Sequence, residues 1–251
     1  MSNQSYPCVL TPENRGLYVA DCFEAMQHDP LDPFVKASYE RFCLDTFQQF
    51  KLAYRLIIVE PLEAKGEPYQ DAEAMFEDIF VNRHLFFYPT MTAFGEGPPL
   101  DNHPLLEPTD FVVGGLTLCV NDLFRVTHDY FGHAPARCGF DSRGEELAWL
   151  SHLPLFHPLA RPAFTTEILG QASWVNFGPH LRNHKGTMIK PGEPGWIPQT
   201  QRPFAEQKAG LLPAVVSGVS LTRDEVSGQI DAEFVDSPIL QAIKRERDSA
   251  E

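Results

Sequence analysis

Two histidines five positions apart are the residues best suited to chemistry in this sequence. His128 and His133 lie in the segment Thr-His-Asp-Tyr-Phe-Gly-His at 127–133. On an unbroken α-helix, five positions rotate by about 500°, so the two side chains would point about 140° apart. Gly132 offers a way to end the helix, because glycine readily adopts the left-handed conformation of helix C-termini. We therefore expect the helix to stop there and His133 to turn back toward His128.

A metal site at these histidines needs a third ligand. The candidate carboxylates are Asp129, Glu145, Glu146 and Glu167. Glu167 lies in an apolar segment, where a carboxylate needs a counter-charge such as a metal ion. Two imidazoles and one carboxylate on one side of an ion are typical of non-haem Fe(II) oxygenases. The same ligands suit zinc in a hydrolase, and a helical binding module with an inert histidine pair is the remaining alternative.

The segment 128–133 resembles the HELLGH-type iron motif of the tetrahydropterin-dependent aromatic amino acid hydroxylases. Further matches in order and residue type are Ala134-Pro135, Gly144-Glu145-Glu146 and Phe-Thr-Thr-Glu-Ile-Leu-Gly at 164–170. The resemblance covers about residues 109–178. It implies a hydroxylase-like helical core, an Fe(II)-dependent monooxygenase activity, and His128, His133 and Glu167 as iron ligands. It also implies tetrahydropterin as electron donor; a substrate that supplies its own electrons is the alternative.

The block 121–177 is also similar to a domain of large phage polyvalent proteins. That similarity indicates a family with a shared site, but it supplies no reaction. The oxygenase interpretation instead gives the expected partners of the chain, a small-molecule substrate and O2.

Three further residues are expected to act at the site. Arg125 lies three positions before His128, and its guanidinium would bind a substrate carboxylate through two hydrogen bonds; an ion pair with Asp122, Asp129 or Glu145 is the alternative. Glu145 would hold a ring N–H of a ligating histidine or serve as a general base. His152 follows Glu145 by two helical turns, where it would act as an acid, a base or a partner of a ligand; a core or surface histidine is the alternative.

The elements expected to position these residues are mainly helical, with minor strand content. Asp32 and Pro33 predict a helix start, and apolar residues at steps of three and four continue it to about residue 55. A second helix is expected to begin at Asp71. Further helices are expected from 109 to about 131, near 145–152, through Glu167 to about 177, and over 237–247. Short strands are expected at 56–59 and 85–88, the latter with a buried turn as the alternative. Residues 1–33 are expected to be rich in turns. The Pro-rich stretches 89–108 and 178–213 are expected to be loops that could close over the site.

Composition narrows the class of protein. The 251 residues carry a formal charge of −14 and are 43% hydrophobic, which argues against a nucleic-acid or anionic-membrane binder. No apolar run is long enough for a membrane span. Five cysteines without a CxxC pair and an N-terminus without a signal-peptide pattern predict reduced thiols in the cytoplasm. We expect a single domain over 1–251 with its metal-site core at about 109–180; the sequence does not set the oligomeric state.

Overall fold

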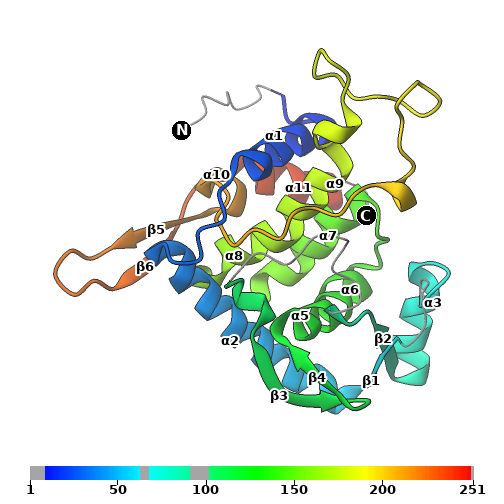
Figure 1. The fold of residues 1–251 in the computed structure, drawn as a ribbon, viewed down its shortest axis with the longest axis vertical. Coiled ribbons are helices and arrows are strands. Elements are labelled where there is room, and N and C mark those ends of the chain that lie inside the picture. Colours follow the sequence, from blue (N-terminus) through cyan, green and yellow to red (C-terminus); the bar gives the residue numbers. More distant parts are fainter. Residues whose placement is uncertain (1–8, 63–67, 91–101, 250–251) are drawn as a thin grey trace.

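The computed structural model describes residues 9–62, 68–90 and 102–249, and helices dominate it, as the sequence predicts (Figure 1). Its α-helices are α1 (Pro12–Ala25), α2 (Pro33–Leu56), α3 (Ala72–Glu77), α5 (Val120–His128), α6 (Ala134–Ala136), α7 (Ser142–His152), α8 (Arg161–Thr165), α9 (Gln171–Phe177), α10 (Ala214–Ser217) and α11 (Pro238–Asp248). Three π-helical turns cover Asp78–Asn82, Asp129–His133 and Thr166–Gly170. The strands are β1 (Ile58–Pro61), β2 (His84–Phe87), β3 (Pro108–Val113), β4 (Leu116–Cys119), β5 (Val219–Arg223) and β6 (Ile230–Phe234).

The strands form three separate two-stranded sheets. β1 pairs with β2 in parallel, whereas β3–β4 and β5–β6 are antiparallel hairpins. The β5–β6 hairpin extends away from the helices (Figure 1). None of the sheets forms a layer of its own, so the helices determine where the core lies.

The long helix α2 begins where the sequence predicts. The Asp32 carboxylate accepts hydrogen bonds from the backbone N–H groups of Phe34 and Val35, at 2.9 and 3.0 Å, and Pro33 occupies the first helical turn. This side chain satisfies N–H groups that the helix itself leaves unpaired. Tyr39 and Phe42, further along the helix, are fully buried. Helix α2 packs against α5 and α8, and so lies against the segments that carry the expected site residues.

The predicted helix over 109–131 is wrong at both ends. Residues 108–119 form the β3–β4 hairpin, and Gly114 and Gly115 make its turn with φ of 57° and 80°. Two successive residues with positive φ make the kind of turn that suits a hairpin, and glycine takes them without strain. Helix α5 then begins at Val120, where the Asp122 carboxylate accepts from the Cys119 N–H at 2.9 Å.

Two apolar clusters fill the interior, and α5 belongs to both. One cluster contains Phe23, Phe42 and Trp149 together with Phe124 of α5. The other lies around β1, β2 and α3, and it includes Leu123 and Val126 of α5. Different faces of α5 are buried in the two clusters, so this helix lies where they meet. His128 is the last residue of α5.

Helix α1 was not expected, because residues 1–33 read as turn-rich. It begins after Thr11, whose hydroxyl accepts from the Asn14 N–H at 3.2 Å, and Pro12 fills the first turn. The terminal helix α11 was expected over 237–247 and is present at Pro238–Asp248. None of the helices in the described ranges is both long and apolar enough to span a membrane.

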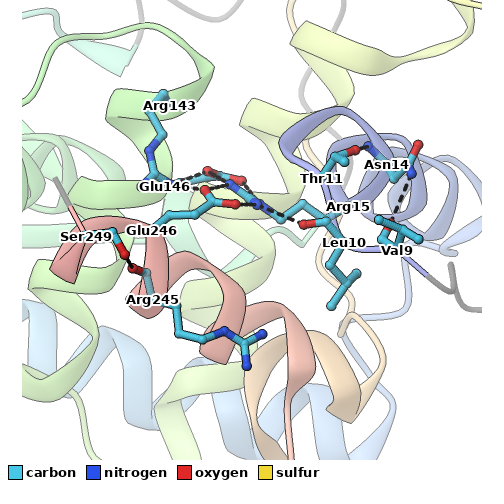
Figure 2. Close-up of polar contacts among 10 residues, drawn as sticks. All are labelled: Val9, Leu10, Thr11, Asn14, Arg15, Arg143, Glu146, Arg245, Glu246 and Ser249. Carbon is cyan, nitrogen blue, oxygen red and sulfur yellow. Dashed lines mark hydrogen bonds and ion pairs between the residues drawn. The ribbon is translucent and has the colours of Figure 1, made fainter.

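A buried ion-pair network joins α1, α7 and α11 (Figure 2). The Arg15 guanidinium, 1% exposed, donates to both oxygens of Glu146 at 2.6 Å and to both oxygens of Glu246 at 2.6 and 2.7 Å. Arg143 adds a bond to Glu146 at 2.9 Å. The network fixes the first turn of α7, which also carries Glu145.

Candidate metal centre

His128 and His133 converge because the helix changes its pitch between them. The π-helical turn Asp129–His133 follows α5 without a break, and the Ala134 N–H bonds to the Asp129 carbonyl, five residues earlier. Such a turn holds one more residue than an α-helical turn, so positions five apart come to the same side. The two rings lie 4.9 Å apart between centroids and are nearly perpendicular.

Gly132 does not end the helix, and this expectation is wrong. Its φ is not positive, and the helical path continues through Ala136. Its importance is spatial, because a Cβ atom at Gly132 would lie 3.0 Å from Nδ1 of His128 and 3.1 Å from the Ala148 carbonyl oxygen. The missing side chain therefore allows α7 and the His128 ring to approach this turn.

Glu145 supplies the carboxylate that faces both rings. Its Oε2 lies 3.6 Å from Nε2 of His128, and its Oε1 lies 3.5 Å from Nε2 of His133. These separations are too long for good hydrogen bonds. Two ligand atoms that share a tetrahedral zinc ion at 2.0–2.1 Å lie about 3.4 Å from each other, close to the spacing here. Within the described residues, His128, His133 and Glu145 are the group able to hold a metal ion.

His133 is oriented by the loop that follows it. Its Nδ1 donates to the Cys138 carbonyl at 3.1 Å, which leaves Nε2 directed at Glu145. Burial lowers the pKa of His133, but the contacts with Cys138 and Glu145 outweigh it and hold that pKa well above its usual value. Burial raises the pKa of Glu145, and the two histidines reverse this, so it stays well below the usual range. Without a metal ion, these opposite shifts favour a protonated His133 beside an ionised Glu145.

His128 is in a different electrostatic state. Burial lowers its pKa, and the neighbouring charge of His133 lowers it further, despite the opposing effect of Glu145. Its Nδ1 lies 3.3 Å from Nδ1 of His152, and its buried Nε2 has no hydrogen-bond partner. A neutral ring with an unpartnered nitrogen beside a carboxylate fits a cation placed between them.

Glu167 was expected as the carboxylate ligand, and the structure places it elsewhere. It lies on the π-helical turn Thr166–Gly170 and faces α2, where Tyr39 donates to its Oε1 and Gln171 donates to its Oε2 at 2.7 Å. Nε2 of His103 lies 3.7 Å from the same carboxylate. Burial raises the pKa of Glu167 to about 8. The apolar sequence around Glu167 correctly indicates burial, and the partners of the buried carboxylate are Tyr39, Gln171 and His103.

The other expected site residues are distributed around the centre. Glu145 is a candidate ligand here rather than a partner of one, and His152 contacts His128 directly. Arg125 is partly buried; its Nε has no hydrogen-bond partner, and among the described residues it forms no ion pair with an acid. Burial raises the pKa of Asp129, next to the first histidine, to about 6.

Sequence reasoning missed Gln49, which accepts from His152 at 2.6 Å, and the Cys138 carbonyl. A residue 103 positions before His152 leaves no local pattern to find. A backbone carbonyl leaves none either, because every residue has one. The spacing of Glu145 and His152, seven apart on one helix, was the available signal, since it puts both on one side of α7.

No family model matches this chain, and no significant match was found among curated proteins or among solved structures.

Proposed function

We propose that this chain is a metal-dependent enzyme, a non-haem Fe(II) oxygenase whose ion is held by His128, His133 and Glu145. The observation that carries the proposal is the unpartnered, buried Nε2 of His128, which faces the same carboxylate as Nε2 of His133. Two histidines and one carboxylate on one side of the ion leave its other positions open. When bound, Fe(II) would supply the activation of O2 for hydroxylation of a small molecule.

The resemblance of residues 109–178 to the aromatic amino acid hydroxylases supports this proposal, including a hydroxylase-like arrangement of the helical core. In our assignment Glu145 takes the place for which the resemblance implies Glu167. The electron donor is either tetrahydropterin, as the resemblance implies, or the substrate itself. We place the enzyme in the cytoplasm because Cys22, Cys43, Cys119 and Cys138 are free thiols.

The residues around the ligands have distinct roles in this proposal. The Phe140 ring lies 4.9 Å from the His133 ring and is 42% exposed, so it marks the side from which a substrate enters. The rings of Phe124 and Phe164 border His128 and exclude water from its inner side. Arg125, with an unpartnered Nε, would bind a substrate carboxylate.

Asp129 favours a second candidate function, a zinc hydrolase. The same three ligands occur in zinc sites that keep a fourth position open. The pKa of Asp129, raised by burial to about 6, lies near the range where a carboxylate serves as a general base at neutral pH. In that function Asp129 would accept the proton of the attacking water.

Metal analysis of matched carboxylate variants tests the proposal. We expect the tag-free protein to contain one metal ion per chain, Glu145→Gln to lose it, and Glu167→Gln to keep it. Loss of metal only in Glu167→Gln would instead support the ligand set implied by the resemblance. No metal in any of the three proteins, even after anaerobic addition of Fe(II) or of zinc, would refute both enzyme functions.

The two enzyme functions are separated by their need for O2. The Fe(II)-loaded protein is expected to consume O2 in an oxygen electrode when supplied with amino acids and a tetrahydropterin, and Glu145→Gln is expected to consume none. Hydrolysis of model esters or amides by the zinc-loaded protein under anaerobic conditions, lost in Asp129→Asn, would favour the hydrolase.

A further inference from the structure

A chain of polar contacts runs from a backbone carbonyl to the ring of His128. Nε2 of Gln49, on α2, donates to the Leu155 carbonyl at 3.2 Å. Oε1 of the same side chain lies 2.6 Å from Nε2 of His152. Nδ1 of His152 lies 3.3 Å from Nδ1 of His128. The chain thus links α2 and α7 to the histidine at the end of α5.

The Leu155 carbonyl determines which group donates and which accepts at each hydrogen bond in this series. A carbonyl oxygen only accepts, so the amide nitrogen of Gln49 must face it and the amide oxygen must face His152. That oxygen also only accepts, so His152 carries its proton on Nε2. His152 is fully buried against three phenylalanine rings and has no carboxylate partner among the described residues, so its ring is neutral. Its Nδ1 therefore has a lone pair and accepts.

The ring of His128 follows from the same logic. Because Nδ1 of His152 accepts, Nδ1 of His128 carries the proton and donates. We propose that Gln49 and His152 are positioning residues that hold His128 as the Nδ1–H tautomer, so that the lone pair of Nε2 faces Glu145. The use of this tautomer in metal binding rests on the proposed function, whereas the tautomer itself is a property of the metal-free protein.

Both histidines of the proposed site are thus oriented by an acceptor at Nδ1. The Cys138 carbonyl accepts from Nδ1 of His133, and the Gln49–His152 pair accepts from Nδ1 of His128. Metal-binding histidines commonly donate their other ring N–H to an acceptor of this kind, which fixes the tautomer and strengthens the ligand. Gln49 therefore acts on the proposed metal site through the rings of His152 and His128, and it does not contact the reacting groups.

The test measures protonation of the ring nitrogens directly. We would record long-range ¹H–¹⁵N spectra of the metal-free, ¹⁵N-histidine-labelled protein, assigning His128 by its loss in His128→Gln. The expected result is a protonated Nδ1 and a lone pair on Nε2. In Gln49→Lys the ammonium group donates to Nε2 of His152. The proton of His152 then lies on Nδ1 and is donated to Nδ1 of His128, so the proton of His128 moves to Nε2. Gln49→Glu keeps an acceptor and is expected to keep the wild-type tautomer.

Zinc affinity, measured by competition with a chromophoric chelator, gives the second readout. Loss of such a partner typically weakens metal binding about 10–100-fold, and we expect this for Gln49→Lys, with Gln49→Glu close to wild type. Gln48→Leu, at an exposed neighbouring position on α2, is the matched control and should leave tautomer and affinity unchanged. Circular dichroism of each variant confirms that the helices remain.

The outcomes separate this inference from the proposed function. A proton on Nε2 of His128 in the wild-type protein would overturn the inference even if zinc binds. An unchanged tautomer in Gln49→Lys would also overturn it. An Nδ1–H tautomer that Gln49→Lys reverses, in a protein that binds neither zinc nor Fe(II), would support the inference while refuting the metal-dependent function.

Discussion

Arg15 and Glu146 form a buried ion pair with two parallel hydrogen bonds of 2.6 Å, although 131 positions separate them in the sequence. Removing one partner of such a pair leaves an uncompensated buried charge. We expect Arg15→Met to lower the free energy of unfolding by about 3 kcal/mol or more, measured by urea denaturation. Lys36→Met, which breaks the exposed pair with Glu40, is the control and should change it by about 0.5 kcal/mol or less. Equal effects of the two variants would contradict the role assigned to the network.

Gly132→Ala is expected to weaken metal binding, although alanine is the better helix former. The new Cβ would press on Nδ1 of His128 and on the Ala148 carbonyl, at 3.0 and 3.1 Å. The ring and α7 would have to move apart, which separates His128 from Glu145. Zinc titrations and thermal unfolding would measure the two effects. Gly139→Ala, where the added Cβ meets no atom within 4 Å, is the control, and equal affinities of the two variants would refute this prediction.

Metal affinity is expected to fall as the pH falls. Burial lowers the pKa of His133, but Cys138 and Glu145 raise it well above the usual value, so a binding metal ion must displace a proton. Below this raised pKa, the apparent affinity should decrease by about tenfold for each pH unit per displaced proton. Calorimetry in two buffers of different ionisation enthalpy would show the released proton. An affinity that is constant from pH 6 to 8 would contradict a raised pKa of His133 in the metal-free protein.

Because the carboxyl group of Glu167 is buried, we expect the free energy of unfolding to decrease as the pH rises. Burial raises the pKa of this carboxyl from 4.5 to about 8, so between these values the folded protein binds a proton that the unfolded chain releases. The unfolded state then binds fewer protons, and the free energy of unfolding falls as the pH rises through this range. The difference between wild type and Glu167→Gln in urea denaturation at pH 5, 6, 7 and 8 isolates this contribution. Parallel pH profiles would show that Glu167 is already ionised in the fold.

The sequence predicts those features that depend on local patterns. The start of α2 follows from Asp32 and Pro33, and a terminal helix was expected over 237–247, where α11 lies. The hairpin at 108–119 was also within reach, because two successive glycines between Val113 and Leu116 are a turn signal. The spacing of the apolar residues there, at 111, 112, 116, 119 and 120, fits a helix as well.

The site is predictable only in part. The two histidines and the list of candidate carboxylates come from the sequence, but the choice among the carboxylates does not. Glu145 reaches the rings because a π-helical turn rotates His133 and because Gly132 allows α7 to approach. The apolar residues around Glu167 suggested it as the ligand. Apolar neighbours in the sequence indicate that a carboxylate is buried, but they do not indicate which group it contacts. Gln49 depends on packing between α2 and α7, which no short segment encodes.

The network around Arg15 gives the chain an order of assembly. During synthesis α1, α5 and α7 are complete before α11 emerges, so Arg15 first has one of its two carboxylates. The Arg15 nitrogens that later bind Glu246 then lack this carboxylate, and the first turn of α7 lacks the contacts made through it. A chain stopped at residue 236 would accordingly hold zinc more weakly than the full chain in an equilibrium titration. In the proposed metal-dependent function, capture of the ion would therefore follow the docking of α11.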